Sequence, residues 1–425
     1  SVNYSYGDKY YASFSFRRDG SSRLSPDTRW GNFWSLSASW RLSQEKFMQS
    51  LKSVLSDLKL RASYGVNGNL PSSYYGYQST YTTGAFYNGK PSPWESTLGN
   101  EELTWEKNYA LNLGLDIGLF SRVNVSLDWY TRTTKDLLMS KQLNSISGFS
   151  SLLTNVGQMR NTGVELEVRS NNIKTKDFSW TTAFNLSHNK NKILKLADLP
   201  WFVDGRYVRK EGYPFNTIYL REYAGVDPET GSALYYDNQQ DENGNYTKNK
   251  VTDPGQASPI PLKDITPTIS GGFMNTFNYK FIDLSFNLSY SFGGYSYDNA
   301  SYILQDDGYS VISNKSTEQR RRWQKPGDIT DVPRFVYGNK KGGNYNSSRA
   351  IHSTDHIRLK SLILGLNAPK AWLQKLGIGN ARIYFSGTNL LTWAAYGQYD
   401  PEMSGVVGFY TPPLKTYAFG LELKF

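Results

Sequence analysis

The last twelve residues, Leu414–Phe425, constrain the fold of this chain most strongly. Side chains of a β-strand alternate between two faces. In a strand, one face of this segment carries only large apolar groups: Tyr417, Phe419, Leu421, Leu423 and Phe425. The other face carries small and charged groups: Thr416, Ala418, Gly420, Glu422 and Lys424. A membrane-spanning β-strand needs about 9–11 tilted residues whose positions alternate between lipid and lumen. The segment therefore predicts a transmembrane β-strand.

The same alternation recurs along the whole chain and predicts twelve further strands. Their ranges are Ser1–Tyr6, Lys9–Phe16, Phe33–Leu42, Leu58–Val66, Tyr109–Leu119, Val123–Trp129, Val164–Val168, Phe178–Leu186, Ile269–Phe281, Leu284–Phe292, Ile357–Leu366 and Ala381–Leu391. We expect Leu113, Leu288, Leu421 and Leu423 to face lipid, and Asn112, Asn287, Glu422 and Lys424 to face the lumen.

The connections between these strands alternate between short and long. Gly7-Asp8 and Phe120-Ser121 are two short ones, and Ser43–Ser56 and Pro369–Gly379 are short amphipathic pieces. The long ones are Gly20–Gly31, Gly68–Glu102, Leu137–Gln158, Lys190–Thr266, Gly294–Thr354 and Trp393–Pro413. Structureless loops of this length are uncommon in a compact soluble domain. Short periplasmic turns and long outer loops are typical of an outer-membrane barrel, so the final strand should end at the periplasm.

Composition is compatible with a barrel and gives little support to other classes. No apolar run approaches the roughly 18 residues of a membrane helix, and mean hydropathy is −0.56. Half of each barrel strand faces a wet lumen, which explains this low value. The chain has no Cys, which excludes disulfides and thiolate chemistry. Its net charge of +10 is dispersed apart from Arg320–Arg322, so a basic lumen or an anionic surface explains it as well as nucleic acid does. We expect no nucleic-acid partner.

Seven motifs follow one another in the order found in a known family. They are Phe16–Arg23 (F-R-R-D-G-S-S-R), Leu58–Asn69 (L-K-L-R-A-S-Y-G-V-N-G-N), Leu103–Asn108 (L-T-W-E-K-N), Asn155–Glu165 (N-V-G-Q-M-R-N-T-G-V-E), Tyr223–Gly231 (Y-A-G-V-D-P-E-T-G), Ser386–Trp393 (S-G-T-N-L-L-T-W) and Tyr399–Glu402 (Y-D-P-E). Over essentially its whole length the chain resembles the SusC/RagA family of TonB-dependent outer-membrane transporters of Bacteroidetes. The terminal Phe425 resembles the C-terminal signal of outer-membrane barrels.

The resemblance implies an all-β fold, a transmembrane antiparallel β-barrel of 22 strands, close to the plugged transporter barrels. Residues 1–425 would supply its thirteen C-terminal strands and long extracellular loops. Ser1 opens in mid-alternation and thirteen is odd, so we expect the first strands, the N-terminal plug and the TonB box to precede this sequence.

The implied function is TonB-dependent uptake of oligosaccharides through a plugged barrel, and we expect no cofactor. A barrel enzyme such as an outer-membrane protease is a further class, but it needs an acid–base cluster at the rim and the chain has only three His, so we expect no enzyme activity. Oligopeptide import by the same mechanism is the alternative, and a passive porin or adhesin barrel stays open. The implied partners are outer-membrane lipid, the TonB complex, which would bind through the missing N-terminal part, and a SusD-like surface lipoprotein over the extracellular mouth. A dimer of such transporter–lipoprotein pairs is a further arrangement. Because long loops are entropically costly to order alone, we expect the lipoprotein to order Lys190–Thr266 and Gly294–Thr354 by contact.

Aromatic and basic side chains in the long loops are candidates for binding ligand or partner. They are Tyr74, Tyr75, Tyr77, Tyr81 and Trp94 in one loop, Trp201, Arg206 and Tyr207 in a second, and Arg320 and Trp323 in a third. Exposed aromatics offer flat faces to sugars or peptide side chains and anchor partner proteins. Packing of the loops on one another explains the aromatic groups equally well, and Arg320 and Trp323 could equally brace their loop.

Two other clusters suggest metal or acid–base chemistry only weakly. His352 and His356 are four residues apart, but at the mouth of a strand the helical i,i+4 geometry does not apply. The run 237–245 resembles a calcium loop, but Gly244 is not where an EF-hand requires glycine, and a polar turn explains the run better. We expect neither a metal site nor a catalytic site.

Overall fold

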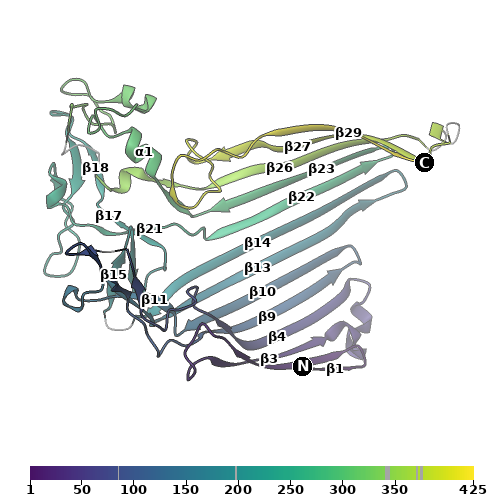
Figure 1. Cartoon of the computed structure of the whole chain (residues 1–425). Coiled ribbons are helices and arrows are strands. Elements are labelled where there is room, and N and C mark those ends of the chain that lie inside the picture. The colour runs from purple at the N-terminus through teal and green to yellow at the C-terminus, as the bar shows by residue number, and fades with distance from the viewer. Residues whose placement is uncertain (85, 197–198, 340–344, 370–371, 374–376) are drawn as a thin grey trace. The chain divides into compact units, whose positions relative to one another are not determined.

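The computed structural model describes residues 1–84, 86–196, 199–339, 345–369, 372–373 and 377–425. Thirteen long strands form one antiparallel sheet in chain order (Figure 1). They are β1 (Val2–Tyr6), β2 (Tyr10–Gly20), β3 (Trp30–Arg41), β4 (Leu55–Asn69), β9 (Glu106–Leu119), β10 (Val123–Lys135), β13 (Gln158–Lys174), β14 (Phe178–Lys195), β22 (Ile269–Tyr279), β23 (Ile282–Phe292), β26 (His356–Asn367), β27 (Asn380–Ala394) and β29 (Thr416–Lys424). The predicted all-β class and the thirteen strands are confirmed.

Several strands are longer than predicted. β13 has 17 residues where the alternation predicted only Val164–Val168, and β14 has 18 where it predicted Phe178–Leu186. The added ends are polar on both faces, as at Arg160 and Asn161 of β13. Alternation of hydrophobicity therefore marks only the part of a strand that has one apolar side, and it misses polar extensions.

The chain divides into two compact units, which are described separately. The first comprises Ser1–Trp201, Lys210–Phe215 and Phe273–Lys280. The second comprises Phe202–Arg209, Asn216–Gly272 and Phe281–Phe425. No helix among the described residues is long and apolar enough to span a bilayer.

One face of the sheet in the first unit is apolar and uncovered. Strand register aligns Ala12, Ala38, Ala62 and Leu113 across β2, β3, β4 and β9. Large side chains on this face are strongly exposed: Tyr4 (60%), Phe14 (45%), Leu36 (53%), Leu60 (43%) and Leu113 (46%). Repeated exposure of large apolar groups along neighbouring strands is the pattern of a lipid-facing barrel wall.

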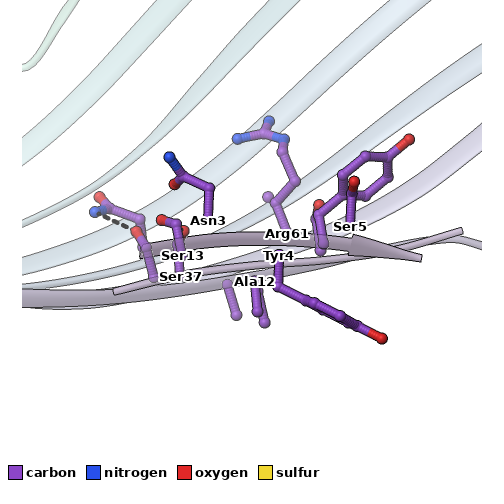
Figure 2. A pocket seen from close by; sticks show the side chains of 14 residues that line it. Asn3, Tyr4, Ser5, Ala12, Ser13, Ser37 and Arg61 are labelled. Carbon is purple, nitrogen blue, oxygen red and sulfur yellow. Dashed lines mark hydrogen bonds between the residues drawn. The ribbon is translucent and has the colours of Figure 1, made fainter. Parts of the chain in front are cut away.

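The opposite face of the first unit is polar. Figure 2 shows the division at the start of the sheet, where Tyr4 and Ala12 point to one side and Asn3, Ser5 and Arg61 to the other. These side chains border a shallow depression of about 440 Å³, which follows the sheet surface and encloses no buried charge.

An ion-pair cluster crosses three strands on this polar face. Arg61 of β4 lies 2.9 Å from a carboxylate oxygen of Asp116 on β9 and 2.9 Å from one of Asp128 on β10. The guanidinium lies over Gly114, where an added Cβ would be 2.5 Å from Arg61 Cζ. A larger residue at Gly114 would therefore force the Arg61 guanidinium to move from its position between the two carboxylates.

The second unit repeats the two-faced pattern. Phe385 of β27 pairs with Leu364 of β26 and Phe419 of β29, and Phe419 is 82% exposed. On the other face Arg382 lies 2.7 Å from Asp283. The register also confirms the predicted sides: Leu421 and Leu423 share the apolar face, and Glu422 and Lys424 the polar one.

The two longest connections fold into small sheets, one of which also includes a strand from the connection that follows β27. One sheet contains β15 (Trp201–Asp204), β16 (Tyr207–Lys210), β17 (Thr217–Leu220) and β21 (Ile260–Asp264). A second contains β18 (Tyr223–Val226), β19 (Ala233–Tyr236) and β20 (Lys250–Val251), and a third β24 (Tyr295–Asp298), β25 (Ile351–Ser353) and β28 (Gly405–Val407).

These small sheets have hydrophobic cores, so the connections contain stabilising contacts that the entropy argument left out. Ile218 and Tyr297 are each 1% exposed in one core, and Tyr235 is fully buried in another. Burial of apolar area offsets the chain entropy that the sequence argument counted alone. The prediction missed these cores because their strands are only two to five residues long. The expectation that a lipoprotein orders the connections stays a prediction.

The short connections are tight, as predicted. Gly7 and Asp8 both have positive φ, as do Phe120 and Ser121, which is the requirement of a type I′ hairpin turn. The amphipathic piece at 43–56 contains two 3₁₀-helices, η1 (Leu42–Gln44) and η2 (Lys46–Leu51). The piece predicted at Pro369–Gly379 lies partly outside the described residues.

Candidate functional site

A cavity of about 710 Å³ lies in the second unit, at the ends of β26 and β27 that are remote from their short turns. We call it the outer cavity. Its walls come from β24, α1 (Asn299–Leu304), the ends of β26 and β27, and the connection that follows β27. The lining residues used below are Asp298, Ser301, Gln305, Arg358, Thr392, Tyr396, Gln398, Tyr399, Asp400, Phe409, Tyr410 and Lys415.

The positive charge of Arg358, which lines the outer cavity, is neutralised by two carboxylates of the same wall. Arg358 of β26 donates to Asp400 at 2.7 Å and to Glu402 at 2.9 Å. The side chains of Arg358 and Asp400 are only 4% and 6% exposed. Both acids belong to the Y-D-P-E motif, so this motif ties the connection to the strand. Removing one member of such a pair would leave a buried charge uncompensated.

Asp298 is held by hydrogen bonds instead of an ion pair. It caps α1 by accepting a 2.8 Å hydrogen bond from the Ser301 backbone nitrogen, and it accepts a second one, of 3.0 Å, from the Tyr396 hydroxyl. Burial raises the pKa of Tyr396, so its hydroxyl stays protonated and donates. Among the described lining residues, Asp298 and Lys415 are the charged side chains without an ion-pair partner, and Lys415 also has no hydrogen bond within the wall.

The rest of the lining is aromatic or uncharged and polar. Phe409 and Tyr410 are 67% and 61% exposed, so their faces are available to a ligand. Gln305 and Gln398 add amide groups. Such a surface offers stacking faces and neutral hydrogen-bonding groups, and little net charge.

His352 lies beside this wall. Its ring stacks on that of Tyr396, with centroids 3.7 Å apart and an interplanar angle of 3°. Its Nε2 is buried and has no hydrogen-bond partner among the described residues. Burial lowers the pKa of His352, an effect that nearby Asp298 opposes in part, so the ring is neutral at pH 7.

Acidification is therefore expected to loosen the sheet of β24, β25 and β28. Because the folded-state pKa of His352 is below its unfolded value of about 6.5, the unfolded segment binds the proton more readily. The stability of the segment is at its full value above about pH 6.5 and falls as the pH drops toward the folded pKa. Hydrogen exchange of β24 and β25, corrected for intrinsic rates, should accelerate in this range. His352→Phe keeps the stack and should abolish the acceleration; an unchanged pH profile in this variant would contradict the role of His352.

The predicted aromatic loop of the first unit is largely exposed. The exposed fractions are 62% for Tyr74, 64% for Tyr75, 65% for Tyr81 and 61% for Trp94. The last two lie on the small hairpin of β5 (Thr80–Thr82) and β8 (Trp94–Thr97). Arg23 lies 4.1 Å above the Tyr74 ring. Tyr77 differs, because it packs against the buried cluster that contains Leu103.

The other predicted residues take mainly packing positions. In the second unit Arg206 lies 4.5 Å from the Tyr297 ring, and Tyr207 packs on the core that contains Tyr297. Trp323 donates to the Pro228 carbonyl at 2.8 Å, which braces its loop, whereas Arg320 is exposed. In the first unit Trp201 is 44% exposed. None of the ten predicted residues, all of which the structure describes, lines the outer cavity. Their roles in binding stay predictions.

The cavity residues were missed because they lie in irregular segments. Tyr396, Tyr399 and Tyr410 fall in the connection Trp393–Pro413, which the sequence identified only as long. The Y-D-P-E motif was the available signal, since its two acids needed a basic partner on a neighbouring strand.

Comparison with known proteins yields a consistent set of matches. The family described as "TonB dependent receptor-like, beta-barrel" matches residues 1–218. TonB-dependent receptor P3 of Formosa agariphila is 33% identical over 459 residues, covering 100% of the chain and 45% of that protein. TonB-dependent receptor SusC of Bacteroides thetaiotaomicron is 30% identical over 453 residues, covering 100% and 43%.

Solved structures give the same picture. A structure of the RagAB peptide transporter matches with a TM-score of 0.89 and 31% identity, over 100% of the chain and 47% of the matched chain. The RagAB peptide importer in its closed-closed state matches with a TM-score of 0.88 and 32% identity. The chain thus spans about half the length of the relatives it matches.

Proposed function

The chain belongs to the TonB-dependent receptor β-barrels of the SusC/RagA type, which lie in the outer membrane, and we propose that it forms the wall and outer loops of an energised importer of oligosaccharides. The proposal combines this membership with the chemistry of the outer cavity. The plug and the TonB-binding segment would be supplied by the rest of the transporter.

The observation that carries the choice of substrate is that the charged groups of the outer cavity, apart from Lys415, are bound by partners within its wall. Arg358, Asp400 and Asp298 are each occupied by partners within the wall. A ligand entering here meets mainly aromatic faces, amides and hydroxyls, with Lys415 as the one cation of the described lining that no partner in the wall binds. Uncharged polyhydroxylated rings match such a lining, because they stack through their C–H faces and hydrogen-bond through their hydroxyls.

Peptide is the second candidate substrate, because the two solved structures named above are those of a peptide transporter and a peptide importer. A peptide backbone could use the same amides and hydroxyls, and Lys415 could pair with a terminal carboxylate. Other charged groups of a peptide would meet Arg358 and Asp400, which pair with each other, and Asp298, which accepts its hydrogen bonds from within the wall.

Replacing Tyr410 by alanine is expected to weaken oligosaccharide binding by roughly tenfold, which corresponds to about 1.4 kcal/mol for one stacking face. Calorimetry on the full transporter, with a panel of neutral oligosaccharides and a tryptic peptide digest, measures this. Tyr337→Ala, which removes an exposed tyrosine (79%) of the same unit outside the cavity, is the control. Binding of peptides alone would favour the second candidate, and uptake that persists after collapse of the proton-motive force would favour a passive porin.

We also propose that a SusD-like surface lipoprotein covers the exposed aromatic hairpins of the first unit. Phe86 and Tyr87, next to the hairpin of Tyr81 and Trp94, are 71% and 80% exposed. Clustered exposed aromatics are typical of surfaces that bury a partner. Purification in mild detergent should recover the complex from wild type and lose it with Tyr81→Ser and Trp94→Ser combined. Tyr337→Ser is the matched control, and equal recovery from all three would contradict this interface.

A further inference from the structure

The connection between β3 and β4 carries apolar side chains that the sheet does not cover. It contains η1 and η2 and joins the first unit's strands at the end of the short turns, which is the periplasmic end of the wall. Phe47 of η2 is 64% exposed and Leu51 is 49% exposed; Val54, just after the helix, is 47% exposed.

The 3₁₀ geometry of η2 separates apolar from basic side chains. Side chains at i and i+3 eclipse in a 3₁₀-helix, so Lys46 and Gln49 share one ridge. Lys52, the C-cap residue with helical φ and ψ, continues that ridge. Phe47 and Leu51 lie on the other two ridges. In the described part of the chain neither lysine has an ion-pair partner.

Glu45 fixes the start of η2 beside the lipid-facing aromatics. Its carboxylate accepts hydrogen bonds from the Tyr10 hydroxyl at 2.7 Å and the Trp40 indole at 3.2 Å. It also pairs with Lys9 at 2.9 Å. The hydrogen bond from Tyr10, followed by those from Lys9 and Trp40, lowers the pKa of Glu45 to about 2, so the carboxylate stays ionised.

These two aromatic residues belong to the apolar face of the wall. Tyr10 and Trp40 are register partners whose rings stack at 6.2 Å, and Leu60 follows Trp40 on β4. They are 43% and 37% exposed. The apolar surface of η2 is therefore a continuation of the lipid-facing surface beyond the end of the strands.

The connection is also held in place from the lumen side. The Ser43 hydroxyl donates to Asp57 at 2.6 Å, and Arg41 donates to the same oxygen at 2.9 Å. Arg41 reaches Asp8 of the neighbouring turn at 3.0 Å. A segment fixed in this way loses little conformational freedom when its exposed face is covered.

We propose that η2 is an interfacial anchor that binds the phospholipids of the periplasmic leaflet. Phe47 and Leu51 insert at the boundary between headgroups and acyl chains, and Lys46 and Lys52 contact the lipid phosphates. A basic ridge beside an apolar surface is the signature of a helix that lies in the membrane interface. Continuity with the lipid-facing wall identifies a lipid surface, and not a periplasmic protein, as the occupant. The inference is independent of the substrate proposed above.

Site-specific fluorescence on the full transporter tests this anchor. The chain contains no cysteine, so Phe47→Cys, Leu51→Cys and Gln49→Cys each give these residues one thiol for an environment-sensitive dye. The labelled proteins are reconstituted in vesicles of phosphatidylethanolamine and phosphatidylglycerol, and heat-modifiable migration verifies the barrel. Spin-labelled lipid should quench the dye at 47 and 51, whereas iodide should quench it preferentially at 49.

Two outcomes would overturn the proposal. Iodide quenching that is equal at the three positions, with no loss of fluorescence to spin-labelled lipid, would mean that η2 is solvated. Lipid quenching that is the same for wild type and for the Lys46→Gln, Lys52→Gln double variant would exclude the phosphate contacts. Hydrogen exchange of residues 46–52, faster in Phe47→Ser than in wild type, provides support that does not depend on a dye.

Discussion

Replacing Asp307 by alanine is expected to destabilise the folded outer connections of the second unit by about 3–5 kcal/mol. The Asp307 side chain is fully buried, and Arg349 donates to it through two nitrogens, at 2.5 and 3.2 Å. Gln319 adds a third hydrogen bond at 2.9 Å. Burial alone would lower the pKa of Arg349, but Asp307 outweighs this effect and raises it. The alanine variant leaves this guanidinium, 12% exposed, without its counter-charge.

Limited proteolysis and hydrogen exchange of residues 295–350 measure the loss locally, because the connections can open without unfolding of the wall. Asp19→Ala is the matched control, since it breaks the exposed Arg17–Asp19 pair and should cost at most about 1 kcal/mol. The double variant Asp307→Ala, Arg349→Met should recover much of the stability, because it also removes the buried guanidinium that the single variant leaves unpaired. Equal protection of the single and double variants would contradict the buried pair.

Arginine at Leu113 is expected to cost about 2–4 kcal/mol of the stability of the membrane-inserted barrel. Leu113 is 46% exposed near the middle of β9 and pairs with Ala62 and Trp129 on the apolar face. An ionised side chain there must displace hydrocarbon contacts and remain in lipid. The neighbouring Asn112, which pairs with Ser63 on the polar face, is the control position.

Urea titrations of refolding into lipid vesicles compare Leu113→Arg with Asn112→Arg in the full transporter. The lumen-facing variant should shift the unfolding midpoint much less, because its guanidinium reaches water. Equal midpoints for the two variants would be incompatible with a sheet that has one lipid face and one wet face.

The lipid-facing wall was predictable because its signal is local. A barrel strand contacts lipid on one side and water on the other, so its sequence carries a period of two wherever the membrane lies. This alternation identified thirteen strands, and it placed Leu113 and Leu421 on the lipid-facing side of their strands, without any contact information. It failed beyond the membrane, where β13 and β14 continue with polar residues on both faces.

The outer connections were not predictable in the same way. The strands β17, β19 and β24 have four residues each, too few to show a period, and they pair with partners that sequence order does not indicate. The parallel pairing of β24 with β28 joins residues more than a hundred positions apart. The expectation from sequence therefore counted the entropic cost of ordering these loops and missed the hydrophobic cores within them.

The sequence by itself determined the class of fold and, through its motifs, the family. It also determined which face of a strand is lipid-facing and which is lumen-facing. Only the tertiary structure decided which charges are neutralised, since Arg358 meets Asp400 and Arg349 meets Asp307 through chain separations of about forty residues. The physical reason is the separation along the chain of the residues that determine each feature. Alternation along a strand is set by the environment of each residue and can be read in order, whereas an ion pair or a cavity exists only after distant segments have been brought together.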